Sequence, residues 1–168
     1  MKKGIILLTL FVMATGVFAQ KYAWVDTDYI LNKMSDYKEA QKILDQLSEK
    51  WQKEAEAKAA EVVKLNEAFK KEQFLLSEEM RAKRIEEIKQ KDMEAKEFQK
   101  QKFGVNGELF QKRQELIKPI QERVYKAIKE VAESGGFTFV FDKANNPGML
   151  YADPKADKTE QVLRKLGL

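Results

Sequence analysis

The sequence contains no cysteine and no histidine, and only three of its 168 residues are proline. Without cysteine there is no disulfide framework, no thiol nucleophile and no cysteine-based zinc site. Without histidine the most common general base is missing as well. These absences exclude whole classes of enzymes and metalloproteins, so the sequence has to be interpreted from its charge, its helical pattern and a few aromatic residues.

Motifs for catalysis or cofactor binding are also missing. The sequence has no phosphate-binding glycine loop, no nucleophile elbow and no metal-binding motif. Asp142 and Asp153 could form an acid pair near the C-terminus, but almost any charged helical protein offers such pairs. The sequence therefore predicts a protein that is not an enzyme and that has no cofactor and no metal site.

The N-terminus has the pattern of a secretory signal peptide. Lys2 and Lys3 precede an apolar run over 4–13, and small residues lead to a cleavage site after Ala19. The apolar run has about ten residues, whereas roughly 20 are needed to cross a bilayer, which argues against the alternative of a membrane anchor. We therefore predict that residues 1–19 are removed and that the mature protein is exported and soluble.

Positive charge is not in excess once residues 1–19 are set aside. Removing Lys2 and Lys3 from the 31 basic residues leaves 29, against 27 acidic residues, a charge of +2. Proteins that bind nucleic acid concentrate a basic stripe, and this chain lacks the charge for one, so no nucleic-acid partner is predicted. A local basic group leaves open a peripheral contact with anionic membrane lipid. This group is Arg81, Lys83 and Arg84.

A long helical pattern fills the middle of the chain. Residues 36–76 contain neither proline nor glycine, and their apolar residues recur at three- and four-residue steps, as in a coiled-coil seam. Ser77, followed by Glu78 and Glu79, is a typical start for a second helix. The sequence therefore predicts an antiparallel helical hairpin with its tip near residues 75–78.

The second helical pattern contains two features that interrupt helices. Pro119 is favoured at the first position of a helix, so a separate helix is predicted over 119–134. Gly104 and Gly107 each cost about 1 kcal/mol relative to alanine inside a helix. Counted from the tip, Phe103 and Gly104 lie level with Trp51, and we expect the two glycines either to make room for its indole or to mark a kink.

Three short segments near the two ends of the chain favour β-strands. They are residues 22–26, 137–142 and 149–151, and the turn-forming residues 145–148 separate the last two. The antiparallel hairpin brings the two ends of the chain together, so we expect these segments to form one small sheet. A closing helix is predicted over 157–166.

The segment FTFVF, residues 137–141, is apolar on both of its faces. One face can pack on the helix predicted over 119–134. The other face needs a cover that the rest of the chain does not offer, and a neighbouring subunit is the simplest source. The predicted interface residues are Tyr22, Trp24, Phe137, Phe139, Val140, Phe141, Met149 and Tyr151.

Two terminal segments resemble the Skp (OmpH-like) family of periplasmic chaperones. They are YAWVDTDYILNKMSDYKEAQKIL and FTFVFDKANNPGMLYADPKADKTEQVLRKLG, which lie on either side of a long charged hairpin. The resemblance implies an α+β fold, mostly α, and a homotrimer in the periplasm. Residues 20–35 and 119–168 would form a trimerisation body with three strands per subunit joined in a barrel-like sheet. Residues 36–118 would form a coiled-coil arm.

The resemblance also implies a function and its partners. Family members hold unfolded outer-membrane β-barrel proteins, without ATP, in a cavity between three arms. This chain departs from the family in one respect, because its arm has no basic surplus with which to attract acidic clients. The alternative is an exported coiled-coil spacer or adaptor without chaperone activity. Such a protein would have long, sustained heptads and no sheet at its ends.

A holdase needs many weak apolar contacts that impose no single geometry on the client. The densest apolar cluster outside the expected body lies at the hairpin tip, and we predict that it binds clients. Its alternative role is simply to close the hairpin turn, because helix ends often carry such hydrophobic contacts. The cluster consists of Phe69, Phe74, Leu75, Leu76 and Met80.

Overall fold

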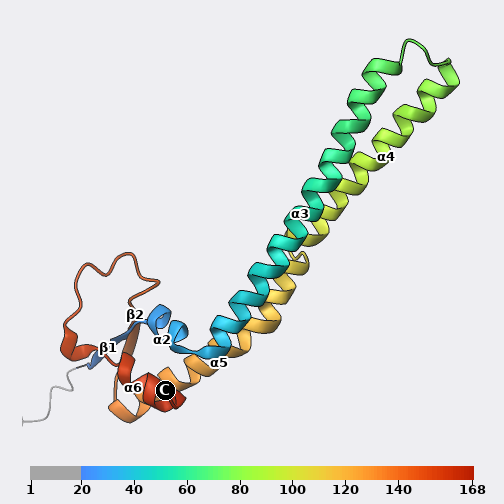
Figure 1. The fold of residues 1–168 in the computed structure, drawn as a ribbon. Helices are drawn as coiled ribbons and strands as arrows, with labels where there is room; N and C mark the ends of the chain where they lie inside the picture. The colour runs from blue at the N-terminus through green and yellow to red at the C-terminus, as the bar shows by residue number, and fades with distance from the viewer. Residues whose placement is uncertain (1–19) are drawn as a thin grey trace, which may run out of the picture. The chain divides into compact units, whose positions relative to one another are not determined.

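The computed structural model of the protein describes residues 20–168 (Figure 1). The predicted signal peptide, residues 1–19, lies outside the described residues. The chain forms two compact units: unit 1 combines the residues up to Ile30 with Val124–Leu168, and unit 2 is Leu31–Arg123. Long helices dominate the chain and a small sheet lies in unit 1, which confirms the predicted α+β, mostly α, fold class.

Unit 1 contains a parallel sheet of two strands, β1 (Tyr22–Val25) and β2 (Phe139–Asp142), which pair along their whole length. The predicted pairing of the first strand with the FTFVF segment is therefore confirmed. β1 has a neighbour on its other side too, where the backbone N–H of Lys158 donates to the carbonyl of Trp24 at 2.9 Å. Within residues 20–168 β2 has no second neighbouring strand, so it is an edge strand.

The prediction of a third strand over 149–151 is wrong, because that segment has no regular secondary structure. After β2 the chain turns at Asn146, whose carbonyl accepts a hydrogen bond from Met149 at 3.1 Å. The chain then passes towards Asp153, whose carbonyl accepts a hydrogen bond from the Trp24 indole at 2.9 Å. This route carries the segment away from the free edge of β2. We call residues 143–153 the outer loop, which runs as an open arch in Figure 1.

The core of unit 1 lies on one face of the sheet. Side chains alternate between the faces of a strand, and Ala23 and Val25 are buried while Tyr22 is exposed. Complete burial of a valine, leucine or isoleucine contributes about 1.5–3 kcal/mol, so this core stabilises the sheet against the helices. Its other members are Ile30 of α2 (Thr27–Lys33), Val124, Ala127 and Val131 of α5 (Glu108–Gly135), and Val162 and Leu163 of α6 (Thr159–Leu166).

Asp142, the last residue of β2, fixes the start of α2. Its carboxylate accepts hydrogen bonds from the backbone N–H of Thr27 at 3.2 Å, the Thr27 hydroxyl at 2.7 Å and the Asn145 amide at 2.7 Å. Burial alone would raise the pKa of Asp142. The hydrogen bonds from Asn145, Thr27 and Ala144 outweigh burial and hold the pKa below its ordinary value of 3.8.

We expect Asp142→Asn to lower the free energy of unfolding by about 1–3 kcal/mol at neutral pH, because hydrogen bonds to a charged acceptor are lost. Since the folded-state pKa is depressed, this stabilisation is present above the unfolded-state pKa and is lost as the pH falls through the folded-state value. Urea unfolding of the wild type and of Asp142→Asn should therefore give a difference in the free energy of unfolding. This difference should be constant between about pH 7 and pH 5 and should shrink below about pH 4. A difference that persists undiminished at the lowest pH would contradict the assignment.

Unit 2 contains the predicted helical hairpin, formed by α3 (Ser35–Glu72) and α4 (Glu78–Phe103). The predicted cap of the second helix is confirmed, because the Ser77 hydroxyl accepts a hydrogen bond from the N–H of Met80 at 3.3 Å. The connection between the two helices spans residues 73–77.

The helix start predicted at Pro119 is wrong, because α5 runs through this residue without interruption. Proline has no N–H and therefore removes one backbone hydrogen bond from a helix interior. Ile117 and Ile120, on either side of the proline, are buried and hold this part of α5 in place. Tertiary packing thus overrides the local preference.

The chain breaks instead at residues 104–107, between α4 and α5, where Asn106 has a positive φ of 61°. The Phe103 ring lies edge-on to Trp51, with 6.5 Å between the ring centroids, so these residues are level in the hairpin as predicted. A Cβ on Gly104 would lie 2.3 Å from the carbonyl oxygen of Lys100. The backbone therefore requires the glycine, and of the two expected roles the structure supports the kink.

Gly104→Ala is expected to lower the free energy of unfolding by about 1–3 kcal/mol, the usual cost of forcing an extra methyl group into a packed position. Gly148→Ala is the matched control, because its Cβ would meet only the Asn146 side chain, at 3.4 Å. Thermal unfolding followed by circular dichroism measures both variants. Equal stability of the two would show that the break tolerates a side chain.

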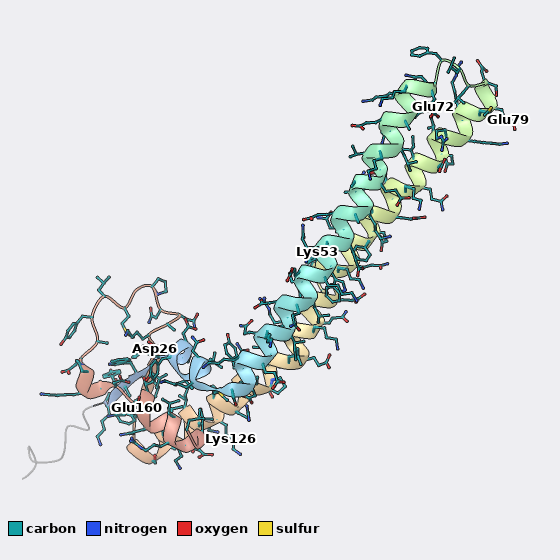
Figure 2. The ribbon with its side chains drawn as sticks, viewed as in Figure 1. Asp26, Lys53, Glu72, Glu79, Lys126 and Glu160 are labelled. Atoms are coloured by element: carbon teal, nitrogen blue, oxygen red, sulfur yellow. The ribbon has the colours of Figure 1, made fainter. Side chains whose placement is uncertain are left out.

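The hairpin is thinly packed over residues 52–103, a fully described stretch in which no residue is buried. Ion pairs join the helices instead, such as Lys91 to Glu61 at 3.3 Å, and Figure 2 shows side chains projecting along the whole hairpin, among them Lys53, Glu72 and Glu79. An exposed ion pair contributes about 0–1 kcal/mol. With few buried contacts to oppose it, local opening should cost less here than in unit 1.

Candidate functional site

The connection between α3 and α4 presents apolar side chains to solvent. Phe74 is 83 % exposed and Leu75 is 87 % exposed, while Phe69 and Leu76 are half-buried and Met80 is exposed. We call these five residues the tip cluster. Backbone hydrogen bonds close the turn, from Gln73 to the Phe69 carbonyl at 2.8 Å and from Leu75 to the Glu72 carbonyl at 2.8 Å.

Two roles were considered for the tip cluster, binding clients and closing the hairpin turn, and different residues of the cluster fit each role. Phe69 and Leu76 are partly covered and fit the role of closing the turn. Phe74 and Leu75 cover nothing, because most of their surface is in contact with solvent. Two large apolar residues exposed side by side at a loop tip are available for a contact with another molecule. Their role in binding clients stays a prediction.

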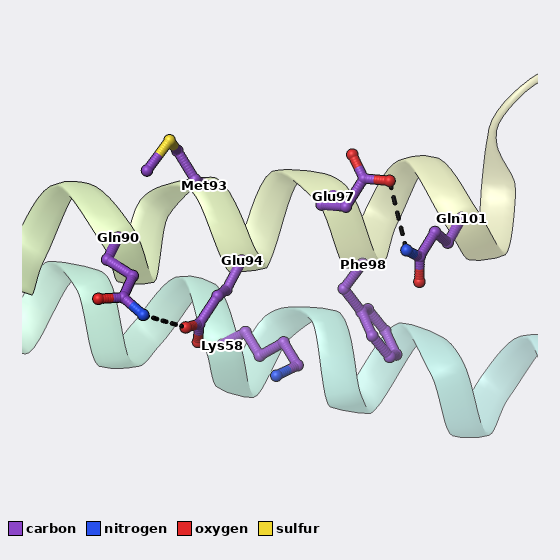
Figure 3. Close-up of a pocket in the computed structure, with 7 residues that line it drawn as sticks. All are labelled: Lys58, Gln90, Met93, Glu94, Glu97, Phe98 and Gln101. Carbon is purple, nitrogen blue, oxygen red and sulfur yellow. Dashed lines mark hydrogen bonds between the residues drawn. The ribbon is translucent and has the colours of Figure 1, made fainter.

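A shallow groove lies on the thinly packed part of the hairpin (Figure 3). Phe98 reaches from α4 towards α3, where the Lys58 ammonium lies 5.5 Å from the ring centroid. Met93 also lines the groove and is half exposed. The groove therefore offers a small apolar surface inside a polar rim. The rim side chains are paired with one another, Gln90 donating to Glu94 and Gln101 to Glu97.

The sheet of unit 1 carries an uncovered aromatic surface on the face opposite its core. Tyr22, Phe139 and Phe141 are stacked, with ring centroids 5.8–6.3 Å apart, and between 41 and 51 % of each residue is exposed. Trp24 faces Phe141 in the strand register and lies on the same face, half-buried. We call these four residues the aromatic face.

The other predicted interface residues are not part of this surface. Val140 pairs with buried Ala23 and so lies on the core side of the sheet. Phe137 is half-buried, with the Lys158 ammonium 5.5 Å from its ring centroid. Met149 and Tyr151 lie in the outer loop, where Tyr151 is 82 % exposed.

Leu150 is 97 % exposed in the outer loop and is missing from the predicted interface residues. In a strand over 149–151, side chains would alternate between the faces, and Leu150 would lie opposite Met149 and Tyr151. Because the segment is a loop, that alternation does not apply. The sequence signal that could have identified Leu150 is the turn at Pro147-Gly148 directly before it.

The two carboxylates considered as an acid pair both have structural roles. Asp142 caps α2, as described above, and Asp153 caps the short 3₁₀-helix η1 (Pro154–Ala156), where its side chain accepts from the N–H of Lys155 at 2.9 Å. Carboxylates that are committed to backbone N–H groups are poorly placed to exchange protons with a substrate. Nothing in their geometry points to catalysis.

Comparison with known proteins identifies the family. Residues 21–166 match the OmpH family, described as outer membrane protein (OmpH-like). The chain belongs to the OmpH-like family. This match confirms the predicted membership and covers both the hairpin and the two ends of the chain that carry the resemblance.

A solved structure shares the fold of this OmpH-like chain. It is the crystal structure of an OmpH-like outer membrane chaperone candidate from Caulobacter crescentus CB15, with a TM-score of 0.65 and 11 % sequence identity. The alignment covers 90 % of this chain and 86 % of the other. No curated protein matches the sequence. Within residues 20–168 of this OmpH-like protein, every helix is too short or too polar to cross a membrane.

Proposed function

We propose that this protein is an ATP-independent holdase chaperone of the periplasm. In this proposal three copies assemble, and unfolded outer-membrane β-barrel proteins are held between their helical hairpins and kept from aggregating. Membership of the OmpH-like family and the chaperone role named for the Caulobacter protein support a chaperone function in general. The observation that carries the proposal is the exposure of Phe74 and Leu75 at the hairpin tip.

The chemistry of the tip fits the chemistry of the proposed client. An unfolded outer-membrane protein exposes lipid-facing apolar residues and unpaired strand edges, both of which drive aggregation in water. Phenylalanine, leucine and methionine side chains offer apolar contact without directional hydrogen bonds, and methionine adapts its shape to different partners. The thin packing of residues 52–103 would let each hairpin adjust to clients of different shape.

Net charge has a small part in the proposed capture. Along the hairpin many charges are paired with neighbours, as in the pairs Lys53–Glu49 at 2.6 Å and Lys96–Asp92 at 2.6 Å. Such pairs leave little net potential to attract an acidic client over distance. Capture would therefore rest on apolar contacts, and the protection of clients should depend only weakly on salt.

The proposal is tested by diluting a urea-unfolded outer-membrane protein into buffer with and without the purified protein. At one trimer per client and without ATP, the solution should stay clear, whereas the client alone should become turbid. A coiled-coil protein of unrelated sequence at the same mass concentration is the control. The spacer or adaptor alternative predicts turbidity equal to that of the control, and this result would refute the holdase function.

A further inference from the structure

The break between α4 and α5 forms a groove that combines apolar side chains with one unpaired positive charge. We infer that this groove binds the C-terminal residue of a client chain, with its free carboxylate on Arg113 and an aromatic side chain against Phe103 and Phe110. The inference rests on the proposed function for the source of that residue, because a held client supplies the chain end. We call it the break groove, and it is lined by residues 103–106, Leu109, Phe110 and Arg113.

The apolar part of the break groove forms where the chain leaves the helix. Gly104 is extended after α4, with φ −66° and ψ 173°, and it has no side chain to fill the space beside it. Val105 is 98 % exposed and Phe110 is 47 % exposed. Phe103 and Leu109 are half-buried. An aromatic ring suits this lining, because aromatic pairs attract each other beyond the effect of the area that they bury.

Two contacts hold the break groove in shape. The Gln111 amide donates to the carbonyl of Asn106 at 3.1 Å, and the Lys102 ammonium bridges the two helices to Glu108 at 2.5 Å. A site whose backbone is already held loses less entropy when a ligand enters. The second contact also neutralises Glu108, so its carboxylate does not oppose an anionic ligand nearby.

Arg113 supplies the charge that would recognise a carboxylate. The stretch 31–123, which is fully described, contains four arginines, and three of them bind a backbone carbonyl or a carboxylate. These three are Arg81, Arg84 and Arg123. Arg113 has neither a hydrogen bond nor an ion pair within residues 20–168. Its guanidinium carries parallel N–H donors that match the two oxygens of a carboxylate.

A chain end fits the break groove better than an acidic side chain within a chain does. In a C-terminal residue the carboxylate and the side chain are attached to the same Cα, so both can enter a groove of about 400 Å³. An internal aspartate or glutamate carries no aromatic ring of its own, and its backbone continues in both directions. Capture of a terminal carboxylate is a known mode of peptide recognition, and chain ends are the least ordered parts of most proteins.

The inference is tested with short fluorescent peptides added to the mature chain, with binding followed by fluorescence anisotropy. The first peptide ends in phenylalanine with a free carboxylate. The second is the same peptide with a C-terminal amide, and the third ends in serine with a free carboxylate. The second and third should bind about three- to tenfold more weakly than the first, because each lacks one charge-assisted hydrogen bond or one aromatic contact.

Variants of the protein assign these differences to the groove. Arg113→Gln should abolish the difference between the acid and amide peptides, and Phe110→Ser should reduce the difference between the phenylalanine and serine peptides. Lys112→Gln is the matched control. It removes the same charge one residue away, from a side chain that pairs with Glu115 at 2.6 Å and does not line the groove. This control should keep both preferences.

Three results would overturn the inference. They are equal binding of the acid and amide peptides by the wild type, a preference for the acid that survives Arg113→Gln, and loss of all peptide binding in Phe74→Ser with Leu75→Ser, which would assign the peptide to the tip cluster. The turbidity assay separates this inference from the proposed function. Protection of clients without a preference for the acid peptide refutes only the break groove, whereas peptide binding without protection refutes the holdase function and leaves the groove as a peptide site.

Discussion

Replacing Phe74, Leu75 and Leu76 together with serine is expected to abolish most protection of an unfolded outer-membrane protein while leaving the assembly intact. Phe74 and Leu75 are almost fully exposed in the isolated chain, so a client that covers them gains about 1.5–3 kcal/mol for each side chain. Since 1.4 kcal/mol corresponds to a factor of ten, the chaperone concentration needed to suppress turbidity should rise by at least about tenfold.

Two further variants make this result specific to the tip. Phe74→Ser with Leu75→Ser leaves half-buried Leu76 in place and should give nearly the whole effect. Val63→Ser with Ile85→Ser changes two half-exposed residues on the helices of the same hairpin and should have a much smaller effect. Equal losses from the tip pair and the helix pair would mean that clients contact the hairpin along its length, and the tip assignment would be wrong.

Introducing glutamate at Phe139 and Phe141 is expected to convert the protein to folded monomers and to remove its protective activity. Both side chains are about half exposed in the single chain, so the charges cost little in the monomer. In an assembly that covers the aromatic face, each buried and unpaired carboxylate is strongly destabilising. Light scattering should report the mass of one chain, and circular dichroism should show unchanged helix content.

Tyr125→Glu is the control for this experiment, because Tyr125 is exposed on α5 outside the aromatic face. It should leave both mass and activity unchanged. If the double glutamate variant keeps the mass of the wild type, the aromatic face is not the subunit interface. If it becomes monomeric and still protects clients, holding does not require three hairpins, and the cavity is not part of the mechanism.

The helices were predictable because their signals are local. Ser77 and the two glutamates after it mark the start of α4, and the side chain of Ser77 caps that helix as expected. The Gly135-Gly136 pair ends α5 in the same local way, with Gly136 at a positive φ of 64°. Such features depend on a few neighbouring residues, so the sequence is sufficient to find them.

The failed predictions depend on contacts between distant residues. Pro119 does not end its helix because buried Ile117 and Ile120 hold it, and their burial is a tertiary property. Residues 149–151 have a strand-like composition, but their path is set by Asp153 and Lys158, which bond to Trp24 more than a hundred residues away. Propensity alone does not contain this information.

The sequence was sufficient to predict which residue types form the candidate site, but not which of these residues are exposed to solvent. The clustering of large apolar residues near residue 75 is visible in the sequence, but the distinction between exposed Phe74 and half-buried Phe69 appears only once the helices pair. In the same way, the FTFVF segment indicates that one face lacks a cover. Which face it is follows from the register of β2 with β1, which places Val140 against buried Ala23.

None of the side chains of α4 is buried, and the structure describes this helix along its whole length. This feature affects how the sequence of the protein can evolve. Substitutions away from packed or capped positions alter the free energy of unfolding by only about 0.5 kcal/mol in either direction. Most of the surface of α4 can therefore be rewritten, in charge or in apolar content, without endangering the fold. Natural selection or protein engineering could therefore adapt this helix to a different set of clients, one substitution at a time.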